Sequence, residues 1–216
     1  MSTDDDDRCT PENVLLAYRH GFFPMANPQD RDAVEWHQWE PRGIMPLDDA
    51  FHVPKRLGRR IRQKPYVITF DKDFRGVISA CSLTREIQER WINPEIIAAY
   101  TTLHDKGYAH SAEAWKDGKL VGGVYGVAMG SAFFGESMFA TADDASKIAL
   151  VHLVGRLRTQ GFTLFDTQMV TPTTEQFGAH SIELDDYLAR LKVALRKPSA
   201  FSPAPPKSNA GAAFKP

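Results

Sequence analysis

The stretch from Gly122 to Gln168 constrains the fold more than any other part of the chain. It begins as a glycine-rich apolar run, GGVYGVAMG, and passes through an apolar helical pattern to a strand-like segment, FTLFDTQ. Glycines inside a strand weaken it but allow a neighbouring backbone or a ligand to come close. A helix between two strands of one sheet is a crossover connection, which favours a mixed sheet. We therefore predict an α+β fold in which helices pack on a mixed sheet.

Three polar side chains stand out in this apolar stretch. Glu136 lies in Gly-Glu-Ser-Met-Phe, and Asp166 and Gln168 lie in Leu-Phe-Asp-Thr-Gln. Residues two apart in a strand point to the same face, so Asp166 and Gln168 are predicted to project together. An acid and an amide in apolar surroundings suit a buried hydrogen-bond network, and they also suit a site that manages protons. From the residues alone, both interpretations stay open.

A basic segment spans residues 52–64, HVPKRLGRRIRQK, and no acid occurs between Asp49 and Asp71. Leu57 and Ile61 are one helical turn apart and give a narrow inward face. The other faces of this helix are cationic and carry Lys55, Arg56, Arg59, Arg60, Arg62 and Lys64. Because the formal net charge of the whole chain is only −1, the cluster is local. It favours a site for a polyanion such as a phosphate backbone over a merely solvated face.

A second aromatic and basic cluster, WHQWEPR, runs from Trp36 to Arg42 within a loop-like segment at residues 26–50. Its tryptophans and arginine could stack on a nucleic-acid base. Tryptophans are also usually well buried, so the composition of the segment favours a small core over base stacking. A contact with a nucleic-acid base is the alternative interpretation.

The composition is that of a globular protein, with 43% hydrophobic and 25% charged residues among 216. No apolar run reaches the ~18 residues that a membrane span requires. The N-terminus lacks the apolar core of a signal peptide, and two cysteines do not make a disulfide framework. We therefore expect a cytoplasmic protein without a membrane span.

The two ends of the chain differ from its middle. Residues 1–9 are acidic and residues 198–216 are rich in proline, serine and alanine, which predicts disordered tails. Residues 10–43 are expected to form a small N-terminal lobe and residues 44–197 the main domain. Helix caps, periodicity and turn residues predict further helices at 10–21, 73–82, 93–106, 143–160, 171–177 and 184–195, and strands at 66–71, 109–115, 119–129, 131–136 and 162–168.

Taken together, these stretches resemble the leucyl/phenylalanyl-tRNA–protein transferases over about residues 11–195. The runs that carry the resemblance are LLAYRHGFFPM, the Trp36 to Arg42 segment, HSAEAW, LVGGVYGVAMG, FFGESMF, ASKIAL and LFDTQ. The resemblance implies an acetyltransferase-like fold for residues 44–197 and a reduced N-terminal lobe. It also implies transfer of leucine or phenylalanine, and less often methionine, from aminoacyl-tRNA to the N-terminal Arg or Lys of a protein. The product is a peptide bond and a destabilising N-terminus that marks the protein for degradation (the N-end rule). The implied enzyme is a cytoplasmic monomer that uses no metal or organic cofactor.

The resemblance also implies roles for individual residues. Asp166 orients or activates Gln168, Gln168 contacts the reacting groups, and Glu136 holds the cationic acceptor. Trp91 stacks on the terminal adenosine, helped by Trp36 or Trp39, because Met25 stands where well-known members have another tryptophan. The apolar amino-acid pocket is expected to be lined by Val124, Phe133, Leu150, Leu153, Leu157 and Phe165, and the tRNA acceptor stem is expected to lie on the basic helix.

Two other functions fit part of the sequence. An acyl-CoA N-acyltransferase of the same fold needs a glycine-rich loop before a helix to hold the pyrophosphate. The segment MFATADD, which precedes the helix at 143–160, has no glycine and carries two acids, which weighs against this function. A non-enzymatic RNA-binding protein would use the basic helix and the tryptophans, but it leaves Glu136, Asp166 and Gln168 without a role. Asp166→Ala discriminates between these functions. RNA binding should survive in every case, whereas turnover should be lost only if the protein is an enzyme.

Overall fold

A computed structural model describes residues 8–84 and 90–204 of the chain. Its helices are α1 (Pro11–Arg19), α2 (Lys55–Arg62), α3 (Phe74–Leu83), α4 (Pro94–Asp105), α5 (Ala145–Thr159), α6 (Pro172–Glu175) and α7 (Leu184–Arg196). Its strands are β1 (Phe23–Ala26), β2 (Val34–His37), β3 (Arg42–Met45), β4 (Val67–Phe70), β5 (Ala109–Lys116), β6 (Lys119–Met129), β7 (Ala132–Ala140), β8 (Leu164–Gln168) and β9 (His180–Ile182). Within the described ranges, no helix is both long and apolar enough to cross a membrane.

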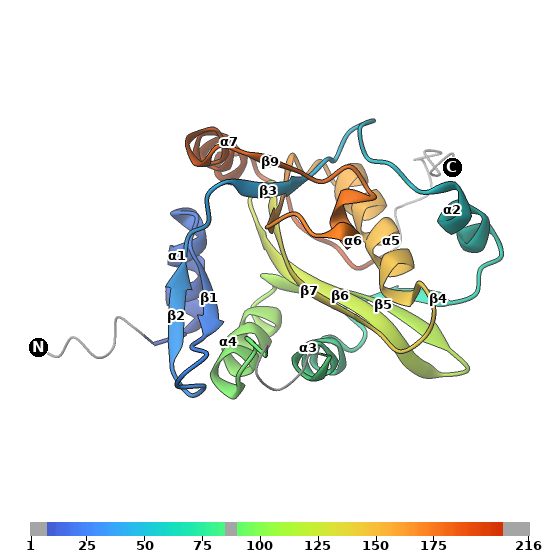
Figure 1. Cartoon of the computed structure of the whole chain (residues 1–216), viewed down its shortest axis with the longest axis horizontal. Helices are drawn as coiled ribbons and strands as arrows, with labels where there is room; N and C mark the ends of the chain where they lie inside the picture. The colour runs from blue at the N-terminus through green and yellow to red at the C-terminus, as the bar shows by residue number, and fades with distance from the viewer. Residues whose placement is uncertain (1–7, 85–89, 205–216) are drawn as a thin grey trace, which may run out of the picture.

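A seven-stranded mixed sheet forms the centre of the molecule, in the order β4-β5-β6-β7-β8-β3-β9. Its pairs are antiparallel except β7 and β8, which are parallel and joined by the crossover helix α5. Helices α3 and α4 cover one face of the sheet, and α5 and α6 lie on the other (Figure 1). The predicted α+β fold with a mixed sheet and packed helices is therefore confirmed.

Local sequence signals explain where many elements begin. The side chains of Thr10, Asp73 and Asn93 accept hydrogen bonds from backbone N–H groups in the first turns of α1, α3 and α4. Asp117 and Gly118 both have positive φ angles, as the tight turn between β5 and β6 requires. These features let the sequence predict α1, α3, α4 and the β5–β6 hairpin closely.

Two hydrophobic cores lie on opposite faces of the sheet, because neighbouring residues of one strand point to opposite sides. Phe134 of β7 packs in the core that includes α3, α4 and Tyr18 of α1. Phe133, one residue earlier, packs in the other core, with α5 and Phe165 of β8. Helix α5 is apolar nearly all round and contributes buried residues along its whole length.

Several segments differ from the sequence-based expectation, including strands β1 and β9, which were not predicted. The loop-like residues 26–50 contain β2 and β3, and β3 lies between β8 and β9 in the sheet. Cys9, assigned to a disordered tail, is 3% exposed, and its N–H donates to the Glu95 carboxylate. Phe201, assigned to the other tail, is 9% exposed and stacks on His110. Strand β3 and both tail contacts depend on partners far away in the chain, which a local pattern does not reveal.

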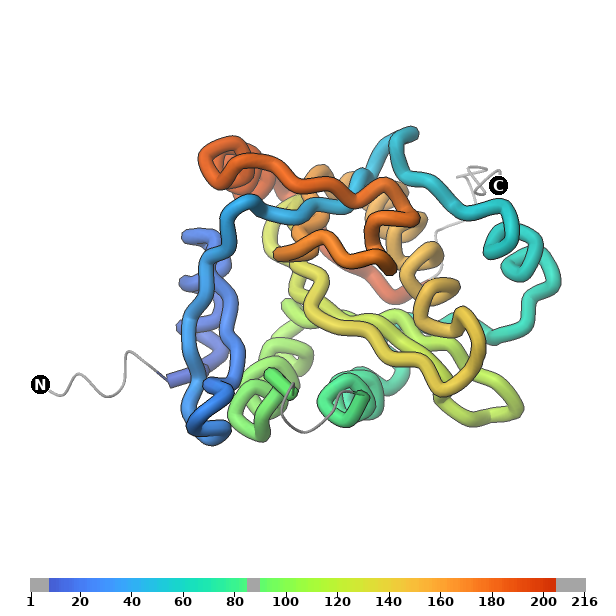
Figure 2. The backbone as a smooth tube through the Cα atoms, viewed as in Figure 1, coloured from blue at the N-terminus to red at the C-terminus, as the bar shows by residue number. Residues whose placement is uncertain are grey.

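The N-terminal elements and the basic helix lie at opposite ends of the molecule. Figure 2 shows α1, β1 and β2 in blue at one end and α2 at the other. The β1–β2 pair forms a sheet of its own. Tyr18 of α1 nevertheless stacks on Phe134 of β7, with ring centroids 4.4 Å apart. The N-terminal region therefore contributes directly to the core of the main sheet.

Candidate active site

A cavity opens where β7 and β8 separate. The two strands pair only between Ala132–Phe134 and Leu164–Asp166, after which β7 continues beside β6 alone. Strand β8 ends at Gln168, whose φ of 55° is in the left-handed region that non-glycine residues seldom adopt. The space between the separated strands belongs to a cavity of about 430 Å³.

One part of the cavity wall is aromatic and apolar. The hydrogen bond from Ala26 N to Trp91 O joins β1 to the segment before α4. Trp39 packs edge-on against Phe23, with ring centroids 5.0 Å apart. The apolar residues that line the cavity are Phe23, Met25, Trp39, Met45, Trp91, Val124, Met138, Leu150, Phe165 and Met169. Such a wall is suited to flat rings and aliphatic side chains.

The other part of the wall is polar. Hydroxyl groups come from Ser137, Ser146, Thr167, Thr171, Thr173 and Thr174. The side chain of Gln168 also lines the cavity. Among the described residues that line it, Glu136 and Lys147 are the two with charged side chains.

Asp166 is enclosed by hydrogen bonds and does not line the cavity. Arg42 donates to both of its carboxylate oxygens, from Nε at 2.9 Å and from Nη2 at 2.7 Å. The Tyr187 hydroxyl donates at 2.7 Å and the Gln168 backbone N–H at 2.8 Å. Asp166 and Arg42 are both 0% exposed. The carboxylate therefore fixes the backbone of Gln168 at the point where β8 turns away.

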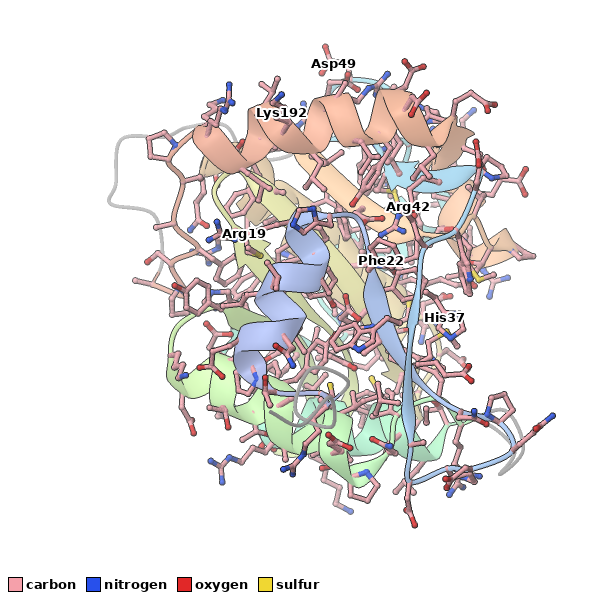
Figure 3. The ribbon with its side chains drawn as sticks, turned by 90° about the vertical axis from the view of Figure 1, so that its left-hand side faces the viewer. Arg19, Phe22, His37, Arg42, Asp49 and Lys192 are labelled. Atoms are coloured by element: carbon pink, nitrogen blue, oxygen red, sulfur yellow. The ribbon has the colours of Figure 1, made fainter. Side chains whose placement is uncertain are left out.

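Arg42 connects this carboxylate to the N-terminal elements. Its Nη1 donates to the Gly21 carbonyl at 2.9 Å, and its guanidinium lies over the rings of Tyr187 and Phe23. Burial disfavours the charge of Arg42, but the adjacent Asp166 outweighs burial and raises the pKa of the guanidinium. Figure 3 shows Arg42 below α7 and close to the β1–β2 strands. A buried, bidentate pair of this kind is costly to break by removing one partner.

Glu136 is the carboxylate that faces the cavity. Its Oε2 accepts from the Tyr100 hydroxyl at 3.1 Å, and Tyr100 in turn contacts the hydroxyl of Tyr18. Its Oε1 is buried and, within residues 8–84 and 90–204, has no hydrogen-bond partner. Burial raises the pKa of the Glu136 carboxyl from 4.5 to about 7, against the opposing effect of the tyrosine hydroxyls. A cation in the cavity would satisfy Oε1 and stabilise the ionised form.

The Gln168 amide is oriented by carbonyl groups on both sides of the cavity. With its nitrogen toward them, Nε2 donates to Gly135 O at 2.9 Å and to Thr167 O at 3.2 Å. The amide oxygen is then the atom left to accept a hydrogen bond from a substrate. Thr167 next to it has a buried hydroxyl oxygen that lacks a partner among the described residues.

The structure brings together some of the predicted site residues and separates others. Glu136, Gln168, Trp91, Val124, Leu150 and Phe165 line the cavity. Phe133, Leu153 and Leu157 are 0% exposed and lie in the core behind it. Trp36 and Trp39 both pack against the other core, and of these two only Trp39 lines the cavity. Strict alternation predicted that Asp166 and Gln168 project from the same face of the strand. Only Gln168 lines the cavity, because its left-handed backbone ends the regular alternation of β8.

The basic helix α2 presents most of its cations to solvent. Lys55, Arg56, Arg59 and Arg62 are exposed, as is Lys64 just after the helix, while Leu57 is buried as predicted. Arg60 differs, since it is half-buried and lies 3.9 Å from both Asp143 and Asp144. This contact holds α2 against the start of α5.

Several important residues were missed by reasoning from the sequence. Arg42 and Tyr187 surround Asp166, and Tyr18 and Tyr100 surround Glu136. The signal for Arg42 was its place in WHQWEPR, and that for Tyr18 its place in LLAYRHGFFPM. No group of three or more His, Cys, Asp or Glu in the described ranges is placed to hold a metal ion.

A sheet whose strands separate around an apolar cavity with one carboxyl group and one amide suits an enzyme that transfers an apolar group. The model for the leucyl/phenylalanyl-tRNA protein transferase family matches residues 44–192, and that for the N-terminal domain of this family matches residues 7–42. The chain belongs to this family, whose members are aminoacyltransferases.

Relatives with this name are similar along nearly the whole chain. The leucyl/phenylalanyl-tRNA–protein transferase of Hyphomonas neptunium is 48% identical over 93% of this chain and 80% of its own length. That of Akkermansia muciniphila is 46% identical over 89% of this chain and 99% of its own length. Among solved structures, the C-terminal domain of a putative lysylphosphatidylglycerol synthetase from Agrobacterium fabrum covers 85% of this chain and 62% of that one. Its TM-score is 0.41 and its identity 13%, a likeness too distant to support an inference about this chain.

Proposed function

We propose that this aminoacyltransferase moves leucine or phenylalanine, and less often methionine, from aminoacyl-tRNA to the N-terminal Arg or Lys of a protein. The observation that carries the proposal is the composition of the cavity. An apolar wall lies next to a carboxyl group whose Oε1 has no partner among the described residues and next to an amide whose nitrogen is held by two backbone carbonyls. The apolar wall suits the transferred side chain. The carboxyl group suits a cationic acceptor, and the amide suits its amine.

In the proposed reaction, the nitrogen of the acceptor's α-amine attacks the ester carbonyl of the aminoacyl-tRNA. The new C–N bond forms, the C–O bond to the ribose breaks, and the proton lost by the amine ends on the ribose oxygen. Because the ester is already activated, the enzyme mainly has to position the two substrates. An α-amine has an unperturbed pKa of about 7.7–8.0, so little assistance is needed to expose its lone pair.

Each polar residue has a distinct part in this scheme. The Gln168 amide oxygen accepts a hydrogen bond from the attacking amine. Asp166 is a positioning residue, because it touches Gln168 through the backbone N–H and is otherwise enclosed by Arg42 and Tyr187. Glu136 Oε1 pairs with the cationic side of the acceptor.

The donor occupies the aromatic part of the cavity and the surface beyond it. Trp91 and Trp39 both line the cavity and offer ring faces to the terminal adenosine, where stacking contributes about 1–3 kcal/mol per base. The side chain of the transferred residue lies against Val124, Leu150 and Phe165. The acceptor stem lies on the exposed cations of α2, where phosphate contacts would give little dependence on the tRNA sequence. We further propose that the enzyme acts as a monomer in the cytoplasm.

The direct test is transfer of labelled leucine from Leu-tRNA to two peptides that differ only at the N-terminus, arginine in one and alanine in the other. Acetyl-CoA serves as a competing donor. Labelling of the arginine peptide alone is the expected result. A folded protein that transfers nothing from any aminoacyl-tRNA would exclude the proposal. Equal labelling of both peptides would exclude the role given to Glu136.

A further inference from the structure

The cavity carries charges of opposite sign on different elements. Glu136 belongs to β7, and Lys147 belongs to the first turn of α5, where Ser146 and Leu150 line the cavity beside it. The side chain of Lys147 is 33% exposed, so its ammonium group is within reach of a ligand and of solvent. None of the residues assigned to the reaction above uses this cation.

Lys147 is connected to the basic helix through Asp144. The Lys147 Nζ lies 3.6 Å from Asp144 Oδ1, and Arg60 Nε of α2 lies 3.9 Å from Asp144 Oδ2. A separation of 3.6 Å is longer than a strong charge-assisted hydrogen bond, so Asp144 satisfies this ammonium only in part. One carboxylate, Asp144, therefore lies between Arg60, the half-buried cation of α2, and Lys147, which lines the cavity.

The two substrates of the proposed reaction differ in charge. The acceptor brings a cationic N-terminal residue and an amine, which Glu136 attracts and an ammonium repels. The donor brings a phosphodiester next to its terminal nucleoside, which an ammonium attracts. Opposite charges on different walls of one cavity would thus attract the acceptor to one wall and the donor phosphate to the other. This electrostatic preference would fix how the two substrates lie relative to each other.

We propose that Lys147 binds the phosphate that precedes the terminal nucleoside of the aminoacyl-tRNA. This inference rests on the proposed function and adds one contact to it. The phosphate on Lys147 and the more distant phosphates on α2 would lie along one path. The acceptor, held by Glu136, would approach the ester from the side without phosphates.

The test compares two donors, phenylalanyl-tRNA and 3′-phenylalanyl-adenosine, which has the same ester but no phosphate. Lys147→Gln should raise the KM for phenylalanyl-tRNA roughly tenfold, the loss expected for one hydrogen bond to a charged group. It should lower the slope of log KM against log salt by about one, as for any single phosphate contact. Its kinetics with phenylalanyl-adenosine and its KM for the arginine peptide should stay unchanged. Lys147→Arg should recover most of the affinity for tRNA.

The matched control is Lys192→Gln, which removes an exposed lysine of α7 (Figure 3) that is not among the residues lining the cavity. It should behave as the unmodified enzyme with both donors. Equal losses with the two donors, or a lower melting temperature, would show that Lys147 only supports α5 and would overturn the inference. An unchanged KM for phenylalanyl-tRNA would overturn it as well. The proposed function fails separately, when the unmodified enzyme transfers nothing from phenylalanyl-tRNA.

Discussion

The two carboxylates near the centre of the molecule, Asp166 and Glu136, are on adjacent parallel strands but differ in almost every physical respect. Asp166 accepts four hydrogen bonds, from Arg42, Tyr187 and the Gln168 backbone, and is fully enclosed. Glu136 has one oxygen on a tyrosine and the other without a partner among the described residues. A satisfied buried carboxylate is part of the structure, whereas a half-satisfied carboxylate beside a cavity is available to a ligand.

Breaking the Asp166 pair should produce the largest effect. Arg42→Met leaves the Asp166 carboxylate buried without its cation and should lower the free energy of unfolding by about 3–5 kcal/mol. The double variant Arg42→Met with Asp166→Leu should recover most of that loss, since no buried charge remains. Urea denaturation of both variants measures the difference.

The control for this prediction is Arg75→Met, which removes an exposed pair with Asp105 at 3.3 Å. Exposed pairs contribute only about 0–1 kcal/mol, so this variant should be nearly as stable as the unmodified chain. If Arg42→Met and Arg75→Met were equally mild, the contrast between the two carboxylates would not hold.

Neutralising Glu136 should reduce catalysis without destabilising the folded chain. Glu136→Gln keeps the size of the side chain but removes the charge that would face the acceptor. We expect kcat/KM for the N-terminal arginine peptide to fall about 100-fold, equivalent to ~2.7 kcal/mol, as for loss of one partner of a buried charge pair. Glu12→Gln, which removes a surface partner of Lys106, is the matched control and should be fully active. Full activity of Glu136→Gln with this peptide would remove Glu136 from acceptor binding.

The aromatic part of the cavity gives a smaller effect. Trp39 lines the cavity and Trp36 does not, although they are only three residues apart. Trp39→Ala should raise the KM for the aminoacyl-tRNA about tenfold through lost stacking, whereas Trp36→Ala should leave it within about twofold. Steady-state kinetics with varied donor concentration separates the two. A larger effect at Trp36 would mean that the donor approaches from the other side of the β1–β2 pair.

The buried Glu136 carboxyl should also make the stability of the folded chain depend on pH. The pKa of Glu136 is raised from 4.5 to about 7 in the folded chain, so the folded chain binds more protons than the unfolded chain in that interval. The stability contributed by this group is therefore complete below pH 4.5 and decreases as the pH rises toward 7. Glu136→Gln should be more stable than the unmodified chain by about 3 kcal/mol at about pH 8, and equal to it at about pH 4.

Thermal or urea unfolding of both proteins across this range measures the effect. The difference in stability between them should develop between about pH 4.5 and about pH 7. A difference that grows toward acid instead would mean that the folded chain stabilises the ionised form of Glu136.

The sequence by itself determined the elements that depend on neighbouring residues and the identity of the most important polar groups. The side-chain caps of α1, α3 and α4, the Asp117-Gly118 turn and the apolar crossover helix are local patterns. Glu136 and Gln168 stood out because polar groups are rare in apolar strands, and the family resemblance was carried by short contiguous runs.

Only the tertiary structure decided how the distant segments meet. Arg42 and Asp166 are 124 residues apart in the chain, and β3 enters the sheet beside β8 without any local signal. The left-handed φ of Gln168 breaks the alternation on which its predicted direction depended. Which of Trp36 and Trp39 lines the cavity, and the presence of Lys147 there, likewise depend on packing across the whole fold. Local propensity and periodicity act over a few residues, whereas burial and charge pairing are set by the complete folded chain.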